Sequence, residues 1–191
     1  FVRDMRPVAS GRKDLPVIIP AEAGREQPGH GRSLDYGDSF LQQDMIQVTQ
    51  LHDEGYDGEG VLIAMLDTGF DTDHQAYRHL DIAAERDFIN WDTETADEPG
   101  DPSGQDGHGT ATLSCVGAAY PGEIYGGSYN ASFILCKTEM VDDEIEVEED
   151  YWVAAVEFAD SLGADVISSS LGYYYWYTYE DMDGNTAVVT I

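Results

Sequence analysis

Two short motifs in this sequence carry the residue types of acid–base chemistry. Asp67 directly follows the unbroken apolar run 61–66 and precedes Thr68-Gly69. His108 lies between two glycines in the string 106–110, Asp-Gly-His-Gly-Thr. A carboxylate that accepts a hydrogen bond from Nδ1–H of an imidazole fixes the tautomer of the ring and stabilises its protonated form. The other nitrogen, Nε2, can then take a proton from a nucleophile. The pair therefore predicts an orienting acid and a general base, if the fold brings them together.

The residues before Asp67 predict a strand that is covered on both faces. Val61 to Leu66 are all apolar, and glycines at 58, 60 and 69 bound the run. A short apolar run between turn residues is typical of a central strand in a parallel sheet. Open α/β sheets bind ligands at the carboxyl ends of their strands, which is where Asp67 would lie.

The spacing of apolar residues predicts the elements around this strand. We expect helices over 39–51, 108–116 and about 151–162, a further strand over 133–136, and another over 164–172 that runs into a turn. The first helix would bury Leu41, Met45, Val48 and Leu51, and the last would bury Trp152, Ala155, Val156, Ala159 and Leu162. Strands that alternate with helices favour a parallel α/β sheet.

The other segments are expected to be mostly loops. Residues 81–107 are rich in Asp, Glu, Pro and Gly, and a new helix is expected to begin near Asn185 or Thr186. The acidic run 142–150 predicts a solvated loop that ends in a helix start, with a metal site or a site for a basic substrate as the alternative. The aromatic residues 173–179 would line an apolar subsite or pack within a loop.

The composition limits the kinds of partner. The chain has 191 residues and a formal net charge of −29, from 38 acids and 9 bases. This balance argues against nucleic acid, because phosphate binding needs clustered Lys and Arg, and against anionic membrane surfaces. No apolar run approaches the roughly 20 residues that a membrane helix needs. A cationic partner, a salty environment or simple solubility would suit the charge.

The first section of the chain differs from the rest. Residues 1–35 contain most of the bases and prolines, which predicts an arm or linker, and the packed domain is expected over 36–191, beginning near Tyr36. The two cysteines, Cys115 and Cys136, lie among apolar residues and are expected to be buried free thiols, with a disulfide between them as the alternative.

Three motifs together resemble those of the subtilisin-like serine proteases, the subtilases. Asp67-Thr68-Gly69, His108-Gly109-Thr110 and Ser170-Leu171-Gly172 are similar to that family's aspartate, histidine and substrate-strand motifs, in the family's chain order. The resemblance implies a three-layer α/β/α fold, incomplete in this chain, and the activity of a serine endopeptidase in a secreted or cell-envelope setting. It implies that Asp67 orients His108 and that His108 is the general base.

The resemblance also implies how substrate binds. The backbone of Ser170, Leu171 and Gly172 would pair with an extended peptide or protein substrate as an added strand. The triad chemistry requires no cofactor. A calcium ligand often found soon after the aspartate motif falls at Ala76, so a calcium site of the family type is doubtful, although the acid-rich loops leave structural calcium possible elsewhere.

Two parts of the family's machinery are missing from these residues. No Gly-Thr-Ser-x-Ala string provides the nucleophile, and no Ala-Gly-Asn string provides the oxyanion asparagine. We therefore expect a companion fragment or further sequence to supply Ser and Asn, and this chain alone to be nearly inert. By the same resemblance, residues 1–35 would be the end of a propeptide or its linker.

Two other functions compete with this interpretation. Apolar-apolar-Asp-Thr-Gly is also the signature of aspartic proteases, but one such motif occurs here and that function leaves His108-Gly109-Thr110 without a role. The second alternative is a non-catalytic acidic binding module on a degenerate protease fold, in which the serine would be absent from the protein altogether.

Overall fold

The computed structural model describes residues 34–142, 145–172, 176–180 and 186–190. They belong to a unit that spans Gly31–Ile191. Nearly all of the predicted arm, residues 1–35, lies outside the described residues, so that its role remains a prediction. Tyr36 is buried, at the point where the packed domain was expected to begin.

A parallel sheet of four strands forms the centre of the structure. The strands are β1 (Leu62–Asp67), β2 (Asp81–Asp87), β5 (Ser132–Lys137) and β6 (Val166–Ser169), in the spatial order β2-β5-β1-β6. In the register of β1 with β5, Asp67 is opposite Lys137. Both strands therefore end side by side at the carboxyl edge of the sheet.

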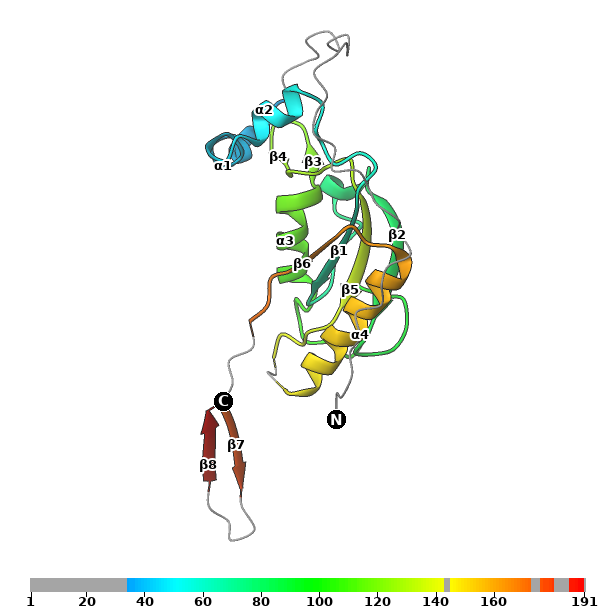
Figure 1. The fold of residues 1–191 in the computed structure, drawn as a ribbon, viewed down its shortest axis with the longest axis vertical. Helices are drawn as coiled ribbons and strands as arrows, with labels where there is room; N and C mark the ends of the chain where they lie inside the picture. The colour runs from blue at the N-terminus through cyan, green and yellow to red at the C-terminus, as the bar shows by residue number, and fades with distance from the viewer. Residues whose placement is uncertain (1–33, 143–144, 173–175, 181–185, 191) are drawn as a thin grey trace, which may run out of the picture. The chain divides into compact units, whose positions relative to one another are not determined.

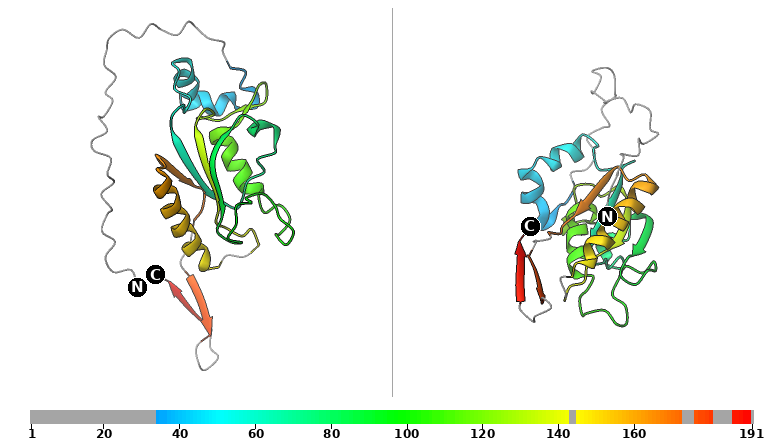
Figure 2. Two further views of the ribbon diagram at one scale, coloured as in Figure 1. Left: turned by 90° about the vertical axis from the view of Figure 1, so that its right-hand side faces the viewer. Right: turned by 60° about the horizontal axis from the view of Figure 1, so that its bottom comes forward.

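Helices cover both faces of the sheet, as Figures 1 and 2 show for α3 (Gly107–Gly117) and α4 (Val147–Leu162). Ile63 and Met65 of β1 pack with Leu113 of α3 in one core cluster. Ala64 and Leu66 pack with the alanines of α4 in a second cluster. Since alternate residues of a strand face opposite sides, this is the three-layer α/β/α arrangement that was predicted.

The remaining elements are short. They comprise the 3₁₀ turns η1 (Gly37–Ser39) and η2 (Gln75–Tyr77), the helices α1 (Phe40–Met45) and α2 (Val48–Asp53), the small antiparallel pair β3 (Ala119–Tyr120) and β4 (Ile124–Tyr125), and the antiparallel pair β7 (Trp176–Glu180) and β8 (Thr186–Thr190). None of the described helices is both long enough and apolar enough to cross a membrane.

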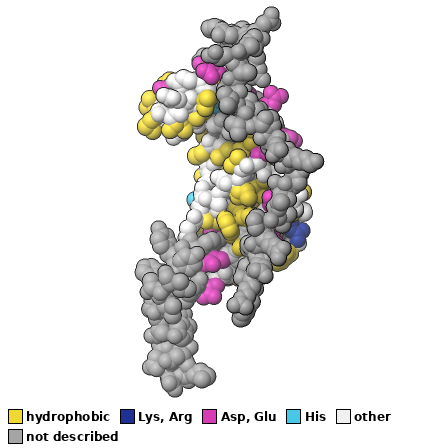
Figure 3. Space-filling model, viewed as in Figure 1, with side chains coloured by type: hydrophobic (Ala, Val, Ile, Leu, Met, Phe, Trp, Pro, Cys, Tyr) yellow, Lys and Arg dark blue, Asp and Glu magenta, His cyan; other side chains and the backbone are white. Residues whose placement is uncertain are grey.

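The first predicted helix is wrong in two respects. It is broken into α1 and α2 by Gln47, which adopts a left-handed backbone with φ of 64°. The face expected to be buried points outward, with Leu41 78% and Met45 77% exposed. Figure 3 shows hydrophobic side chains on the surface of this region. The face that turns inward is polar, because the Gln43 side chain donates to the carbonyl of Tyr125 at 3.0 Å.

Other predictions also need correction. Residues 81–87 form strand β2 rather than loop, and residues 186–190 form strand β8 where a helix was expected to begin. The helix α4 begins at Val147, inside the acidic run, and Glu148 is buried rather than solvated. Its carboxylate accepts hydrogen bonds from the backbone N–H groups of Met140 and Ile145. Acceptors were needed there because these N–H groups have no strand partner.

Three further expectations meet mixed outcomes. Both cysteines are free thiols and Cys136 is buried, but Cys115 is exposed on the outer side of α3. In α4 the alanines 155 and 159 are buried as expected, whereas Leu162 is exposed. The aromatic residues 173–175 lie outside the described residues, so the two roles considered for that segment remain open.

Candidate active site

Asp67 faces α3 because of its place in the strand. Ile63 and Met65 face that helix, and Asp67 continues the same alternation at the end of β1. Its side chain is 1% exposed. Oδ1 accepts hydrogen bonds from the backbone N–H of Thr68 at 2.8 Å and from Nδ1 of His108 at 2.6 Å. Oδ2 accepts one from the hydroxyl of Thr112 at 2.9 Å.

His108 lies in the first turn of α3 and joins this buried carboxylate to solvent. Its side chain is 52% exposed, although its Nδ1 contacts Asp67. An ionised carboxylate can only accept hydrogen bonds, so this contact requires a proton on Nδ1, and in the neutral ring Nε2 then has a free lone pair. The expected contact is therefore present, in the tautomer that a general base requires.

Two glycines allow α3 to approach β1 this closely. A Cβ atom on Gly109 would lie 2.1 Å from the carbonyl oxygen of Gly69 and 3.0 Å from the Cβ of Asp67. Gly69 has φ of 137°, and a Cβ there would lie 2.6 Å from the carbonyl oxygen of Thr95. Gly109 is thus explained by contact with the backbone of the Asp67 motif, and Gly69 by contact with the loop at Thr95, reasons that the sequence alone did not supply.

The loop between β2 and α3 is fastened to the end of β1. The N–H of Phe70 donates to the carbonyl of Thr95 at 2.8 Å. Gln105, which is buried, donates to the carbonyls of Thr68, at 2.7 Å, and Glu139, and its Oε1 accepts from the N–H of Val141 at 3.1 Å. Gln105, which lies just before His108 in the sequence, thereby links the loop that follows β1 to the loop that follows β5.

Two carboxylates fix the residues immediately before α3. The N–H of Asp106 donates to Asp97 Oδ1 at 2.7 Å, and the N–H of Asp97 donates to Asp106 Oδ2 at 3.2 Å. Burial, together with the neighbouring charges of Asp97 and Asp71, raises the pKa of Asp106. This reciprocal pair closes the loop and sets the position from which α3 begins.

A buried lysine anchors the same loop at the edge of the sheet. Lys137, the last residue of β5, is 0% exposed and places Nζ 2.7 Å from Asp101 Oδ2 and 3.0 Å from Asp87 Oδ2. Burial alone would lower the pKa of Lys137, but hydrogen bonds to Asp101 and Asp87 outweigh burial and raise it. The pKa of Asp101 is lowered even though its own burial acts to raise it, because the ammonium group of Lys137 donates to it.

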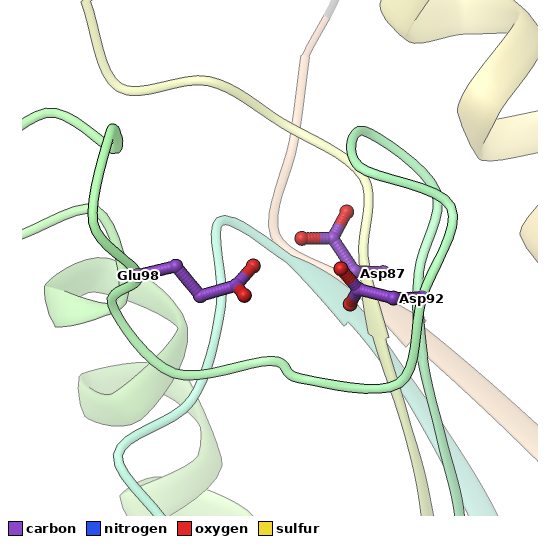
Figure 4. A group of neighbouring side chains, drawn as sticks. All are labelled: Asp87, Asp92 and Glu98. Carbon is purple, nitrogen blue, oxygen red and sulfur yellow. The ribbon is translucent and has the colours of Figure 1, made fainter.

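One group of acids could contribute several ligands to a metal ion. Within the described ranges, Asp87, Asp92 and Glu98 place one carboxylate oxygen each within 4.8 Å of one another (Figure 4). Lys137 already supplies a positive charge beside Asp87, and Glu98 accepts a hydrogen bond from Asn90. Ala76, at the family's usual calcium position, lies in the apolar core, so its side chain offers no ligand there.

The predicted substrate segment follows β6. Strand β6 pairs with β1, and among the described strands it is an edge of the sheet. Ser170 and Gly172 are exposed and Leu171 is half-buried. Parallel strands leave a sheet at the same end, so Ser170, Leu171 and Gly172 begin on the carboxyl edge that also holds Asp67.

Sequence reasoning missed Thr112, Gln105 and Lys137. Only Thr112 had a readable signal, because residue 112 follows residue 108 by one helical turn and shares its face. Gln105 and Lys137 act through loops that are distant in sequence, so their roles become visible only in the folded chain.

Comparisons with known proteins agree with this geometry. A sequence model of the subtilase family matches residues 58–189. Subtilisin amylosacchariticus from Bacillus subtilis subsp. amylosacchariticus and subtilisin J from Geobacillus stearothermophilus are each 27% identical over 191 residues, which cover 98% of this chain and 43% of theirs. The chain thus spans less than half the length of these relatives.

A solved structure shows the same fold. A serine protease from Aeromonas sobria, determined in complex with a chaperone, superposes with a TM-score of 0.54 at 18% identity, covering 72% of this chain and 23% of that one. The family match spans most of the chain and includes the strand of Asp67, the helix of His108 and the strand before Ser170. On this basis the chain belongs to the subtilase family of serine proteases.

Proposed function

We propose that these residues supply the acid and the base of a serine endopeptidase. Asp67 would hold His108 by the 2.6 Å contact between Oδ1 and Nδ1, and His108 Nε2 would remove the proton from a serine hydroxyl as it attacks the peptide carbonyl. The same nitrogen would then donate that proton to the leaving amine. This contact between a buried carboxylate and a half-exposed imidazole is the observation that carries the proposal.

The nucleophile and the oxyanion donor would come from outside these 191 residues. The relatives are more than twice as long as the matched region, and no Gly-Thr-Ser-x-Ala string occurs here. We therefore propose a further segment or companion fragment that brings Ser and Asn to the carboxyl edge of the sheet. Residues 1–191 alone would lack the group that attacks the substrate, and their turnover would be negligible.

The substrate would be a peptide or protein bound in an extended conformation. Ser170, Leu171 and Gly172 would offer backbone hydrogen bonds to it beside His108. The triad uses only side-chain and backbone groups, so the proposed reaction requires no cofactor, and we propose no nucleic acid or membrane partner. A secreted or cell-envelope location is proposed from the family resemblance.

Labelling with a fluorophosphonate probe tests this function in the complete protein. The probe should label one serine outside residues 1–191, and His108→Ala should abolish labelling because the serine loses its base. His79→Ala is a matched control, since His79 is exposed and its ring contacts only a backbone carbonyl, that of Tyr129, at 3.0 Å. Absence of labelling and of peptide hydrolysis in the wild-type complete protein would instead favour a non-catalytic binding module.

A further inference from the structure

We propose that Thr112 is a positioning residue that holds the second oxygen of Asp67 and weakens the attraction between this carboxylate and the protonated ring of His108. This inference rests on the proposed function, because it assigns to Thr112 a role in the pairing of Asp67 with His108. It is carried by a hydrogen bond that neither the motif nor the family resemblance predicted.

The orientation of the Asp67 carboxylate depends on the hydrogen bonds that its two oxygens accept. Oδ1 is engaged by His108 and by the N–H of Thr68, both on one side of the group. Of the groups that the structure describes, Thr112 is the one whose donor reaches Oδ2, at 2.9 Å. Contacts to both oxygens prevent rotation about χ2, so that Oδ1 stays directed at Nδ1.

The hydroxyl of Thr112 has a single proton and two acceptors within reach. Besides Asp67 Oδ2 it lies 3.0 Å from the carbonyl of Gly109, one turn earlier in α3. That carbonyl is neutral, whereas the carboxylate is charged, and hydrogen bonds to charged groups are roughly twice as strong. The proton therefore goes mainly to Asp67.

Donation to Oδ2 draws negative charge away from the oxygen that faces the imidazole. The attraction between Asp67 and the protonated ring is therefore weaker with Thr112 than without it. Removing the Thr112 hydroxyl should therefore favour the protonated form of the His108 ring. The position is half-buried, so the effect is less screened than it would be at the surface.

Other charged groups also face this site, and none of them changes when Thr112 is replaced. They are Asp71 after β1, Lys137 at the end of β5, and Asp97 and Asp106 in the loop before α3. Tyr77 of η2, whose hydroxyl donates to the carbonyl of Thr110, is titratable but stays neutral, because burial raises its pKa to about 12. A difference between variants thus isolates the Thr112 hydroxyl.

The test is the pH dependence of kcat/KM in the complete protein with Thr112→Val, Thr112→Ser and Ser114→Ala. Valine preserves the shape of the side chain and removes the hydroxyl, and serine restores it. Ser114→Ala is the matched control, because Ser114 makes the same kind of bond to a carbonyl of α3, that of Ala111 at 2.6 Å, without touching Asp67, and its other partner, the Tyr77 hydroxyl, is neutral. Circular dichroism establishes that each variant is folded.

We expect Thr112→Val to move the acid limb of the profile upward by about half a pH unit, because a hydroxyl dipole exerts only part of the one-to-three-unit effect of a full charge. Thr112→Ser should restore the limb and Ser114→Ala should leave it in place. A nuclear magnetic resonance titration of the His108 ring should show the same shift without any assay of activity.

The outcomes separate this inference from the proposed function. An unmoved or downward-shifted limb in folded Thr112→Val, with activity still abolished by His108→Ala, overturns the role of Thr112 alone. Undiminished hydrolysis in His108→Ala overturns the function on which it rests. If Thr112→Val does not fold, Thr112→Ala provides the same comparison of the acid limb.

Discussion

Replacing Lys137 with methionine perturbs the anchor that holds the loop before α3 to the sheet. The side chains of Lys137 and Asp87 are each 0% exposed and that of Asp101 is 12% exposed. Methionine fills a similar volume but leaves two carboxylates close together without their cation. Removing one member of a buried ionic group costs about 3–5 kcal/mol, and we expect the free energy of unfolding of the complete protein to fall by that amount near pH 7.

The loss should depend on pH in a direction fixed by the two shifted groups. The pKa of Asp101 is lowered, so its contribution is present above the ordinary aspartate value of about 4 and is lost as pH falls through the folded value. The pKa of Lys137 is raised, so its contribution is present below about 10.4 and is lost as pH rises through the folded value. The difference between wild type and Lys137→Met should therefore be largest between these limits.

Urea unfolding at several pH values measures this difference. Arg78→Met is the matched control, because it removes the same positive charge from an exposed position and should change stability by less than about 0.5 kcal/mol. Adding Asp87→Asn to Lys137→Met should recover part of the loss, since the amide oxygen can still accept from the N–H groups of Ile89 and Asn90. Equal losses in Lys137→Met and Arg78→Met would refute the anchor and indicate general repulsion in a chain of net charge −29.

Two further predictions concern α3 and the thiols. Gly109→Ala should cost roughly 1–3 kcal/mol of stability and should reduce kcat/KM, because its Cβ would lie 2.1 Å from the carbonyl oxygen of Gly69. Gly107→Ala should do neither, because a Cβ there would have no atom within 4 Å. Equal effects of the two substitutions on unfolding and turnover would contradict the close contact at Gly109. A thiol reagent should modify Cys115 in the native protein but not Cys136, because burial raises the pKa of Cys136 to about 12. Mass spectrometry of the labelled protein checks this, and labelling of Cys136 in the native protein would count against its place in the core.

The central strand and the fold class were predictable because their signals are local. Strand β1 is apolar on both faces, so its sequence reports burial without knowledge of what covers it. Strand β2 was missed for the opposite reason. Among the strands that the structure describes it lies at an edge of the sheet, and it is mostly polar, from Asp81 to Asp87; edge strands commonly carry charged residues.

The direction of a helix face is not contained in its periodicity. The apolar spacing in residues 41–51 correctly indicated helix, but it could not tell whether Leu41 and Met45 turn toward the sheet or away from it. The inward position is taken by Gln43, because the carbonyl of Tyr125 needs a donor there. That need arises from a segment 82 residues away in sequence.

The acid and the base of the candidate site were predictable from the sequence, but the residues that hold them in place were not. Asp67 and His108 could be paired because Asp67 follows an apolar strand, His108 lies at a helix start, and their motifs occur in the chain order of the subtilases. Lys137 and Gln105 could not be predicted, because they act on loops that only the parallel sheet brings to its carboxyl edge. Charge alone, in a chain with 38 acids, did not distinguish Asp97 and Asp101 from the others.

A double-mutant cycle on Asp67 and His108 tests the central claim most directly. In the complete protein His108→Ala should lower kcat roughly 10⁶-fold and Asp67→Ala roughly 10⁴-fold, and the double variant should be no slower than His108→Ala, because Asp67 acts only through the imidazole. Losses that multiply in the double variant, or hydrolysis that survives removal of His108, would contradict the pairing.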